Sequence, residues 1–374
     1  MIGSMEGDAK PPPTNKSALL QTTTTSTLFC IMQISELPQP PVGRTGWPWT
    51  EGEPEARCPS SPRDRSPKIT IVTPSFNQGQ YLEETIRSVL LQDYPDLEYL
   101  VIDGGSSDES VEIIRKYGEY LAYWTSEKDD GQTHAINKGF ARATGEWLGW
   151  LNSDDVYLPG VLSWLAAKVR EAPKVAWVAG AVDFIGPKPG VRLQQPGANL
   201  IEWLTHQAEF SQPGAFWKRD VMEGLGPLVE SMHYSFDWEL WCRFVAHGLM
   251  PLCDARPVAR FREYPASKSC SRWDRFCAEN EAILDRFLSR LSVSERRQAE
   301  HCRLDFIATR LTLETKRLCE QGTGWRALHN LWTTVLSRPR LLLTKRIPYR
   351  GSAQACKTVW ARRTGTMQSG RPPA

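Results

Sequence analysis

The residues best suited to chemistry follow an apolar run near the middle of the chain. Residues 147–151 read W-L-G-W-L and lead directly into Asn152, Ser153, Asp154 and Asp155. An apolar run of this length, bounded by polar turn residues, is typical of a buried strand in a parallel sheet. Two adjacent carboxylates at its end favour a divalent cation, because Mg²⁺ and Mn²⁺ prefer oxygen ligands alongside substrate phosphates. The simpler alternative is a polar turn in which Asp155 caps the next helix.

Two further acidic turns follow other expected strands. Asp103 ends the run L-E-Y-L-V-I-D and precedes two glycines, so its carboxylate could accept a hydrogen bond from a ribose hydroxyl or a pyrimidine N–H. Asp129 begins the turn D-D-G-Q ahead of an expected helix. The structural alternatives are a simple D-G-G turn for the first and helix capping by Asp130 for the second. Because the carboxyl ends of parallel strands meet at one edge of a sheet, we expect all three acidic turns to converge.

These turns belong to an alternation of strand and helix patterns that begins at Lys68, which predicts an α/β fold with a mostly parallel sheet and right-handed crossovers. The expected strands cover residues 68–73, 97–103, 121–126, 147–151, 175–183, 215–217 and 258–262. The expected helices cover residues 81–91, 108–117, 132–142, 160–170, 201–205 and 237–246. The first strand leads into T-P-S-F-N-Q-G and lacks G-x-G-x-x-G, which argues against NAD or FAD.

Composition separates this central region from both ends of the chain. The four expected parts are residues 1–66, 67–270, 271–330 and 331–374. The first is rich in Pro, Thr, Ser and Gly and is expected to be mostly disordered, apart from a strap at 37–50 held by Trp47 and Trp49. The third is a helical extension, heavily charged over residues 273–321, and the fourth is a basic tail without Asp or Glu.

The overall composition excludes several classes of protein. A formal net charge of +2 over 374 residues gives no reason to expect nucleic acid as a partner. Nine cysteines without a C-x-x-C pair indicate reduced thiols, and no apolar segment reaches the roughly 18 residues of a membrane span. We therefore expect a cytoplasmic protein, with peripheral contact to an anionic membrane through the basic tail as a further hypothesis.

Six segments taken together resemble a known family. They are T-P-S-F-N-Q, V-I-D-G-G-S-S-D, D-D-G-Q-T-H-A-I-N-K-G-F, A-T-G-E-W-L-G-W-L-N-S-D-D, Q-P-G-A-F-W and F-D-W-E-L-W-C-R-F. In this order, over about residues 68–268, they are similar to the family 2 glycosyltransferases with the GT-A fold, a Rossmann-like architecture. The resemblance implies a nucleotide-diphosphate-sugar donor, with UDP as the expected nucleotide, a Mn²⁺ or Mg²⁺ cofactor, and inverting transfer by single displacement.

The resemblance also implies roles for individual positions. Those at the donor are Thr73, Pro74 and Asp103 at the nucleoside, Asp129 near the nucleotide or sugar, and Asn152 and Asp155 in the D-x-D-like element. Asp154 is the implied main metal ligand. The family more often has Asp at the position of Asn152; an amide can accept a hydrogen bond from ribose but brings no charge, so we expect a less negative metal site.

An inverting transferase needs a base for the acceptor hydroxyl, and the family places an acid at the start of a helix after the variable region. Asp237 and Glu239 are the candidates, and at 100° per residue only one of them can face the cleft. Glu239 shares a face with Arg243 and is expected to form a solvated ion pair. We therefore predict Asp237 as the base, with a pKa raised by apolar neighbours. The usual partner acid is replaced by Phe236.

The remaining candidates have a structural alternative each. Arg260, Arg262 and Lys268 could steady the leaving diphosphate or be surface charge. Four tryptophans could stack on an acceptor sugar, although core packing is the more ordinary role of such residues. They are Trp203, Trp217, Trp238 and Trp241. The segment S-C-S-R-W lacks the Gln of the Q-x-x-R-W found in processive relatives, which favours transfer of a single sugar.

The expected function is therefore single-sugar transfer to a carbohydrate or lipid-linked acceptor in polysaccharide or glycolipid biosynthesis. Two other functions stay open at this point. One is a non-catalytic nucleotide-sugar-binding protein, suggested by Asn152 and Phe236. The other is a nucleotidyltransferase, which is disfavoured because no Gly-rich triphosphate loop follows the first strand.

Overall fold

The structure is a computed structural model that describes residues 34–52, 66–268, 272–321 and 323–337. Most of the segment expected to be disordered and most of the basic tail lie outside these residues. The predictions made for residues 1–33, 53–65 and 338–374 are therefore not addressed by the structure. Among the described residues, no helix combines the length and the apolar content needed to cross a membrane.

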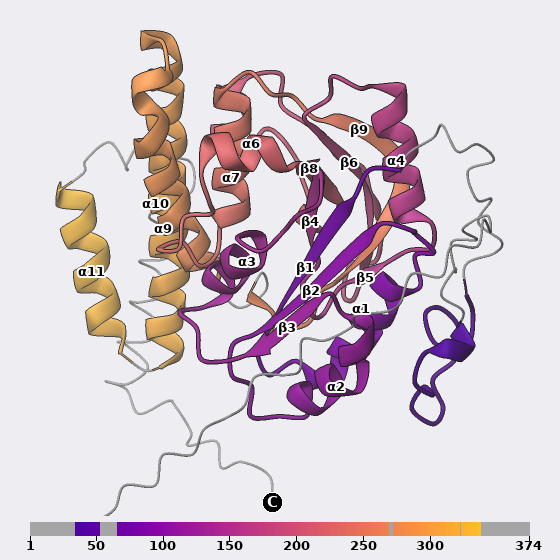
Figure 1. Cartoon of the computed structure of the whole chain (residues 1–374). Coiled ribbons are helices and arrows are strands. Elements are labelled where there is room, and N and C mark those ends of the chain that lie inside the picture. The colour runs from indigo at the N-terminus through magenta and orange to yellow at the C-terminus, as the bar shows by residue number, and fades with distance from the viewer. Residues whose placement is uncertain (1–33, 53–65, 269–271, 322, 338–374) are drawn as a thin grey trace, which may run out of the picture. The chain divides into compact units, whose positions relative to one another are not determined.

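A mixed sheet of nine strands forms the centre of the described chain (Figure 1). Its strands are β1 (Ile69–Ser75), β2 (Leu97–Asp103), β3 (Tyr123–Ser126), β4 (Trp147–Trp150), β5 (Val156–Tyr157), β6 (Trp177–Ile185), β7 (Gly190–Arg192), β8 (Ala215–Lys218) and β9 (Leu252–Arg262). The order is β3-β2-β1-β4-β8-β6-β9-β5, with β7 paired to β6. The first four of these strands are parallel, whereas β8 is antiparallel to both β4 and β6.

Helices cover both faces of the sheet (Figure 1). They are α1 (Gly79–Leu90), α2 (Ser110–Tyr117), α3 (Gln132–Phe140), α4 (Val161–Glu171), α5 (Leu200–Leu204), α6 (Arg219–Leu225) and α7 (Phe236–Ala246), followed by the three C-terminal helices α9 (Trp273–Phe287), α10 (Val293–Glu320) and α11 (Gly324–Ser337). Alternate residues of each strand point to opposite faces, which gives two separate cores. Ile71 packs with α1, α2 and α4, whereas its neighbour Val72 packs with α3 and α7.

The two cores differ in character. The core under α3, α5 and α7 is strongly aromatic and includes Trp150, Trp177, Trp203, Trp217, Trp238 and Trp241. Rings of Trp150 and Trp241 are stacked at 6.2 Å, and Trp177 stacks on Trp241 at 5.1 Å. The four tryptophans considered above as acceptor platforms are therefore core residues, each at most 9% exposed. Their large apolar rings stabilise the fold in place of contacting a ligand.

The segment around residues 37–50 packs on α1. Trp49 is buried, and the Trp47 indole donates a hydrogen bond to the carbonyl of Tyr157 at 2.8 Å. The fully buried Arg87 of α1 donates to the carbonyls of Pro38, Pro48 and Trp49 at 2.7 to 3.2 Å. A buried guanidinium is tolerated there because its donors meet backbone oxygens.

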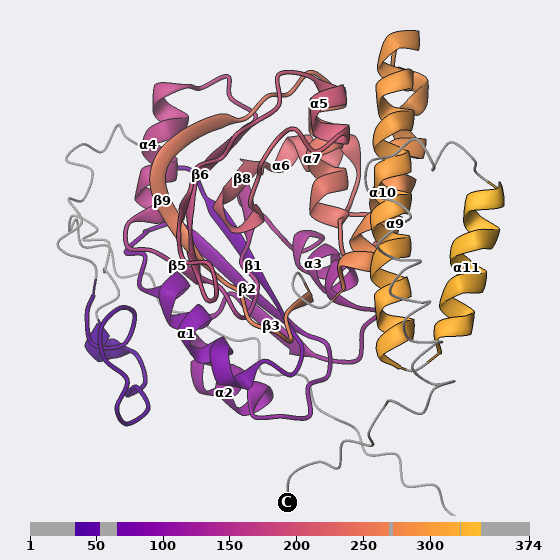
Figure 2. The same ribbon diagram turned by 180° about the vertical axis from the view of Figure 1, so that it is seen from behind.

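The C-terminal helices lie side by side in both views (Figure 2). The charged segment expected to be helical over 273–321 is two helices, because a short 3-10 turn, Leu288–Arg290, separates α9 from α10. Ser292 then caps α10 in a capping box with Glu295, which fixes the start of the new helix. A third helix, α11, continues to Ser337, seven residues past the boundary expected at 330.

Candidate active site

The carboxyl ends of β1, β2, β3 and β4 meet at one edge of the sheet (Figure 1). Ser75 lies opposite Asp103, which in turn lies opposite Ser126. Leu151, just after β4, donates its N–H to the carbonyl of Val72 at 3.0 Å. The loop that begins at Asn152 therefore leaves the sheet beside the loops that follow Ser75 and Asp103, as expected for parallel strands.

Asp103 is fully buried, and residues close to it in sequence hold its carboxylate. Oδ2 accepts hydrogen bonds from the N–H groups of Gly105 and Ser106 and from Ser126 Oγ at 2.7 to 3.1 Å. Oδ1 accepts from Ser106 Oγ at 2.6 Å. The carboxylate thus shapes the turn between β2 and α2, which is the alternative considered for this motif, and it lies at the carboxyl end of β2.

Asp129 lies against this turn. A Cβ built on Gly104 would come within 2.7 Å of Asp129 Oδ2, so the close approach of the two loops requires glycine at position 104. Oδ1 of Asp129 accepts a hydrogen bond from Gly131 N at 2.8 Å, directly before α3. Gly131 has a φ of 112°, a conformation that favours glycine. The acidic turns after β2 and β3 are therefore in direct contact.

The loop after β4 is held from two sides by residues far away in sequence. Thr85 Oγ1 of α1 donates to the carbonyls of Ser153 and Asp155 at 3.0 and 2.8 Å. The backbone N–H of Arg262, at the end of β9, donates to Asp155 Oδ1 at 3.0 Å. The Arg262 side chain donates to the carbonyl of Asp154 at 3.1 Å and pairs with Glu84 at 3.2 Å. Because β5 follows this loop, Asp155 does not cap a helix.

Asp154 and Asp155 share a poorly solvated environment. Burial and the neighbouring charge of Asp154 hold the pKa of Asp155 well above its usual range, and burial also raises the pKa of Asp154. Two adjacent carboxylates in such a place are stabilised by a cation, which would reverse both shifts. In the described part of the chain, no three Asp, Glu, His or Cys side chains form a cluster suited to a metal ion. The donor set fits a cation that takes its other ligands from a bound diphosphate and water.

Tyr264 fixes the Asp154 side chain. Its hydroxyl donates to Asp154 Oδ2 at 2.8 Å and accepts from Gln78 Nε2 at 3.1 Å. The Tyr264 ring packs 5.4 Å from the ring of Tyr81, and the Arg262 guanidinium lies 4.6 Å from the centroid of that second ring. Tyr264 therefore connects the first turn of α1 to the acidic loop.

Gln132 connects the acidic loop to α3 and to Lys268. Its Nε2 donates to Asn152 Oδ1 at 2.8 Å, and its Oε1 accepts from Lys268 Nζ at 2.8 Å. Asn152 Nδ2 in turn donates to Asp155 Oδ2 at 3.3 Å. The Lys268 ammonium also interacts electrostatically with Asp129 and with Asp154. Contacts thus run without a gap from the Asp103 turn to Lys268.

The other two candidate cations have different surroundings. Arg262 contacts the acidic loop as described, whereas Arg260 pairs with Asp183 of β6 at 3.4 Å. Thr73 and Pro74 are both buried in β1, and the Thr73 hydroxyl lies 3.0 Å from the hydroxyl of Tyr99 on the neighbouring strand β2. The Thr73 side chain therefore packs against the strand beside it, and Pro74 lies one residue nearer to the edge.

Asp237 lies in the first turn of α7. It is partly buried, and Oδ1 accepts a hydrogen bond from Trp238 N at 2.8 Å. Burial raises the pKa of Asp237 to about 6, and the nearby Glu279 carboxylate contributes to the same shift. The expectation that apolar surroundings raise this pKa agrees in direction with the structure. Phe236 is buried in the aromatic core beside Trp150, at 5.9 Å between ring centroids.

Glu239 corrects one expectation. It does pair with Arg243, at 2.7 Å, but both side chains are buried and Glu239 is also 2.9 Å from Arg286 of α9. Arg243 additionally donates to the carbonyls of Leu225, Gly226 and Pro227 at 2.8 to 3.0 Å. The helical periodicity predicted the pairing of Glu239 with Arg243 but could not predict its burial, because the C-terminal helices cover this face of α7. The ion pair is a buried link between α7, the end of α6 and α9.

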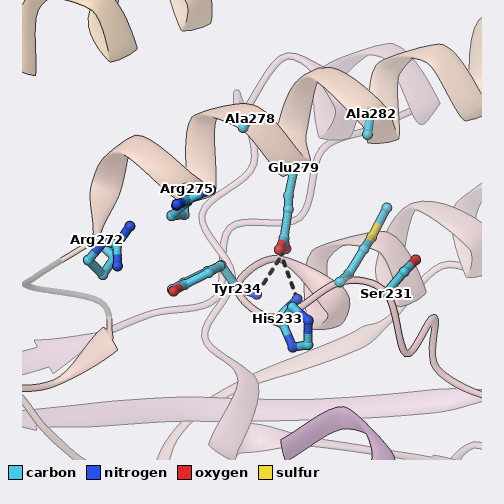
Figure 3. A pocket seen from close by; sticks show the side chains of 9 residues that line it. Ser231, His233, Tyr234, Arg272, Arg275, Ala278, Glu279 and Ala282 are labelled. Carbon is cyan, nitrogen blue, oxygen red and sulfur yellow. Dashed lines mark hydrogen bonds between the residues drawn. The ribbon is translucent and has the colours of Figure 1, made fainter. Parts of the chain in front are cut away.

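Glu279 of α9 binds the N-terminus of α7 (Figure 3). Its carboxylate accepts three backbone hydrogen bonds, from His233 at 2.8 Å, Tyr234 at 2.9 Å and Ser235 at 2.7 Å. A carboxylate is favourable there because these N–H groups, at the N-cap Ser235 and just before it, have no partner within the helix. The C-terminal extension thereby fixes the segment that carries Asp237.

Sequence reasoning missed Thr85, Tyr264 and Glu279. Thr85 lies within an amphipathic helix and Glu279 within a highly charged one, so neither stands out from its neighbours. Tyr264 follows the last strand without a motif of its own. Gln132 belonged to a recognised motif, D-D-G-Q, but the pattern gave no indication of its partners.

The amino-acid sequence is similar to known proteins of one family. The family described as glycosyl transferase family 2 matches residues 70–222. An uncharacterized glycosyltransferase of Rickettsia typhi is 25% identical over 244 residues, which are 62% of this chain and 74% of the relative. A Campylobacter jejuni protein described as GalNAc(5)-diNAcBac-PP-undecaprenol beta-1,3-glucosyltransferase is 35% identical over 109 residues, 28% of this chain and 35% of the relative. The chain spans 59% of the length of two further curated relatives.

A solved structure shares the fold. TarS residues 1–349 from S. aureus superimpose with a TM-score of 0.52 at 18% identity, covering 81% of this chain and 93% of that one. The same fragment in complex with UDP gives a TM-score of 0.50 at 16% identity. At this level of identity the similarity concerns the arrangement of the strands and helices.

Proposed function

The chain belongs to glycosyl transferase family 2 and has the GT-A fold, and on this premise we propose that it transfers a single sugar from a nucleotide-diphosphate sugar to an acceptor hydroxyl, with inversion. In this reaction the acceptor oxygen forms a bond to the anomeric carbon while the bond from that carbon to the diphosphate breaks. The hydroxyl proton passes to a base, and the nucleoside diphosphate leaves.

The observation that carries the proposal is the continuity of the acidic edge. Asp103, Asp129, Asn152 and Asp154 come from three different loops, yet hydrogen bonds and close contacts connect them. Acids gathered at the carboxyl ends of parallel strands suit a nucleotide on one side and its diphosphate on the other. TarS, which has the same fold, has a structure in complex with UDP, which supports a UDP-linked donor.

Donor binding is assigned to this edge. The Asp103 turn would hold the nucleoside together with Thr73 and Pro74. Thr73 would contribute through its backbone, because its side chain packs against Tyr99. Asp154 would bind a divalent cation, Mn²⁺ or Mg²⁺, with Asp155 beside it. When bound, such a cation supplies positive charge opposite the departing diphosphate.

Asp237 is assigned as the base. A pKa of about 6 lets the carboxylate be ionised near neutral pH while it remains basic enough to accept a proton. Its helix is fixed by Glu279, which holds the base at a constant orientation to the acceptor. Glu239 is unsuited to the role because the buried Arg243 and the more exposed Arg286 both pair with its carboxylate.

The relatives suggest where the reaction belongs. The C. jejuni relative is named for transfer to a glycan on undecaprenol diphosphate, which supports a role in building cell-envelope glycans. A carbohydrate or lipid-linked acceptor is proposed on this basis. Asn152 does not weigh toward a non-catalytic protein, because its amide occupies a bonded position between Gln132 and Asp155.

A panel of nucleotide sugars tests the proposal. The full chain should hydrolyse one donor slowly in the presence of Mn²⁺, with release of the nucleoside diphosphate, and a chelator should stop the reaction. A protein that binds UDP with Mn²⁺ but hydrolyses no donor and transfers no sugar would be a nucleotide-sugar-binding protein instead.

A further inference from the structure

A cavity of about 490 Å³ lies between the segment before α7 and the first turns of α9 (Figure 3). Its lining residues are Ser231, Met232, His233, Tyr234, Arg272, Arg275, Ala278, Glu279 and Ala282. Arg272 belongs to the segment S-C-S-R-W noted in the sequence, whereas the other lining residues were not singled out there. The volume is within the range of sites that bind small molecules.

The cavity adjoins the proposed base. Ser235 follows the lining segment and donates its N–H to Glu279, and Asp237 comes two residues later. The Glu279 carboxylate therefore lies at the start of the helix that carries Asp237. On the other side, Lys268 contacts the carbonyl of His233 and connects through Gln132 to the acidic loop. The cavity therefore adjoins both the helix that carries Asp237 and the lysine that contacts Gln132.

Positive charge predominates among the groups at one end of the cavity. Arg272 and Arg275 share a single carboxylate, Asp274, at 3.3 and 3.9 Å. The Glu279 carboxylate is engaged by three backbone N–H groups and is therefore already stabilised. Two guanidinium groups against one shared aspartate leave donors for an anion.

Tyr234 lies beside these arginines and is fixed in place. Its ring packs against Phe276 of α9 at 5.4 Å, and Lys268 Nζ lies 6.0 Å from the ring centroid. Figure 3 shows the Tyr234 hydroxyl directed toward the end of the cavity where Arg272 lies. Met232, Ala278 and Ala282 add apolar surface to the lining. The cavity thus combines a cationic end, an aromatic ring and an apolar floor.

We propose that this cavity is an acceptor subsite, in which Arg272 and Arg275 bind a phosphate group carried by the acceptor. The inference rests on the proposed function, because it names the class of acceptor for the same transfer. Guanidinium groups bind phosphate oxygens in pairs, and a sugar attached to that phosphate would extend toward Asp237. Recognition of the acceptor would then depend on a helix outside the region shared with the family.

Binding of glycerol 1-phosphate to the full chain saturated with UDP and Mn²⁺ tests the proposal, with glycerol as the uncharged counterpart. Because UDP occupies the donor site, binding of glycerol 1-phosphate measured by calorimetry reports a second site. We expect glycerol 1-phosphate but not glycerol to bind. The variant R272Q/R275Q should weaken this binding by about tenfold or more, since charge-assisted hydrogen bonds are lost. R297Q, which removes an exposed arginine of α10, should bind as the wild type does.

A second arm uses vesicles of phosphatidylglycerol to separate the two sources of phosphate. Arginine-dependent binding to the soluble probe indicates a phosphate on the glycan, and arginine-dependent binding to vesicles alone indicates a lipid phosphate. Equal binding by the wild type and R272Q/R275Q in both arms, or no binding in either, would overturn the proposal. UDP binding by every variant shows that the donor site is intact, so failure of this inference is distinct from failure of the proposed function.

Discussion

At the donor edge, Asp103 receives its hydrogen bonds from residues at most 23 positions away, whereas the N-terminus of α7 is bound by Glu279, 44 to 46 positions along the chain. The first region is a set of turns that follow their own strands. The second is an assembly of α7, α9 and the segment before α7. In the proposed function, local turns supply the groups for the donor, and long-range contacts set the orientation of the helix that carries the proposed base.

The loop of Asn152, Asp154 and Asp155 combines both modes. Its position follows from β4, but its side chains are held by Tyr264 and Arg262, 110 and 107 positions away. A substitution within the loop should therefore affect only the reaction of the donor. A substitution of a distant partner should show how much the orientation of the loop side chains contributes. The following predictions test this difference.

The largest effect is expected for D154A. Without this carboxylate the cation loses its main protein ligand, and we expect Mn²⁺-dependent donor hydrolysis to fall by about 100- to 1000-fold. Donor hydrolysis at saturating Mn²⁺ measures it. D130A removes an exposed carboxylate at the same edge of the sheet and should keep wild-type activity. Equal activity of D154A and the wild type would contradict the metal assignment.

D237N should reduce transfer without weakening donor binding. An amide cannot accept the hydroxyl proton, so turnover is expected to fall by about 100-fold while UDP binding stays unchanged. Calorimetry with UDP and a transfer assay provide the comparison, with D220N on the exposed face of α6 as the control. In the wild type the base must be ionised, so transfer should fall as the pH drops through about 6. Full turnover in D237N would exclude this residue as the base.

E279Q should separate orientation from chemistry. The glutamine amide has one acceptor oxygen in place of two, so at least one of the three hydrogen bonds is lost and the others lose their charge assistance. We expect turnover to fall by about tenfold without a change in donor affinity. Because the charge of Glu279 raises the pKa of Asp237, its removal should move the acid limb of the pH profile to lower pH. The control is E281Q, on the same helix as Glu279, which breaks an ion pair with Arg310 of α10 and should leave turnover and the pH profile unchanged. An unshifted limb with normal turnover would argue against the positioning role.

Y264F should have the smallest effect. The ring can still pack on Tyr81, but Asp154 loses the hydroxyl that orients it. We expect Mn²⁺ affinity, measured by calorimetry in the presence of UDP, to weaken by about tenfold. Y94F removes a hydroxyl bonded to the carbonyl of Pro67, away from the site, and should leave the affinity unaltered. Unchanged Mn²⁺ affinity in Y264F would mean that the loop alone orients Asp154.

The sequence predicted the parallel half of the sheet well. The range of β2 agreed at both ends, and β1, β4 and α3 agreed to within two residues at each end. These elements follow one another with short connections, so hydrophobic periodicity and turn residues define them locally. The second half was harder. β9 begins at Leu252, six residues before the expected start, because its first residues are only partly buried and lack a strong pattern.

The candidate site shows the same division. The acids after β2, β3 and β4 were predicted from their positions at the ends of strands, and the structure places their loops in contact. Glu239 was assigned to a solvated pair because helical spacing identifies a partner but not what covers it. The partners Thr85, Tyr264 and Glu279 could not be found, because no local pattern distinguishes a residue whose role depends on a contact tens of positions away.

The sequence by itself determined the alternation of strands and helices, the acidic turns that end the parallel strands, and the family to which they are similar. These features depend on backbone preferences and on side chains within one element. The tertiary structure alone decided which carboxylates are desolvated, which are already bound and which face a cavity. Burial, charge and hydrogen bonding at a group depend on everything packed around it, and here those neighbours come from β9, α1 and the C-terminal helices.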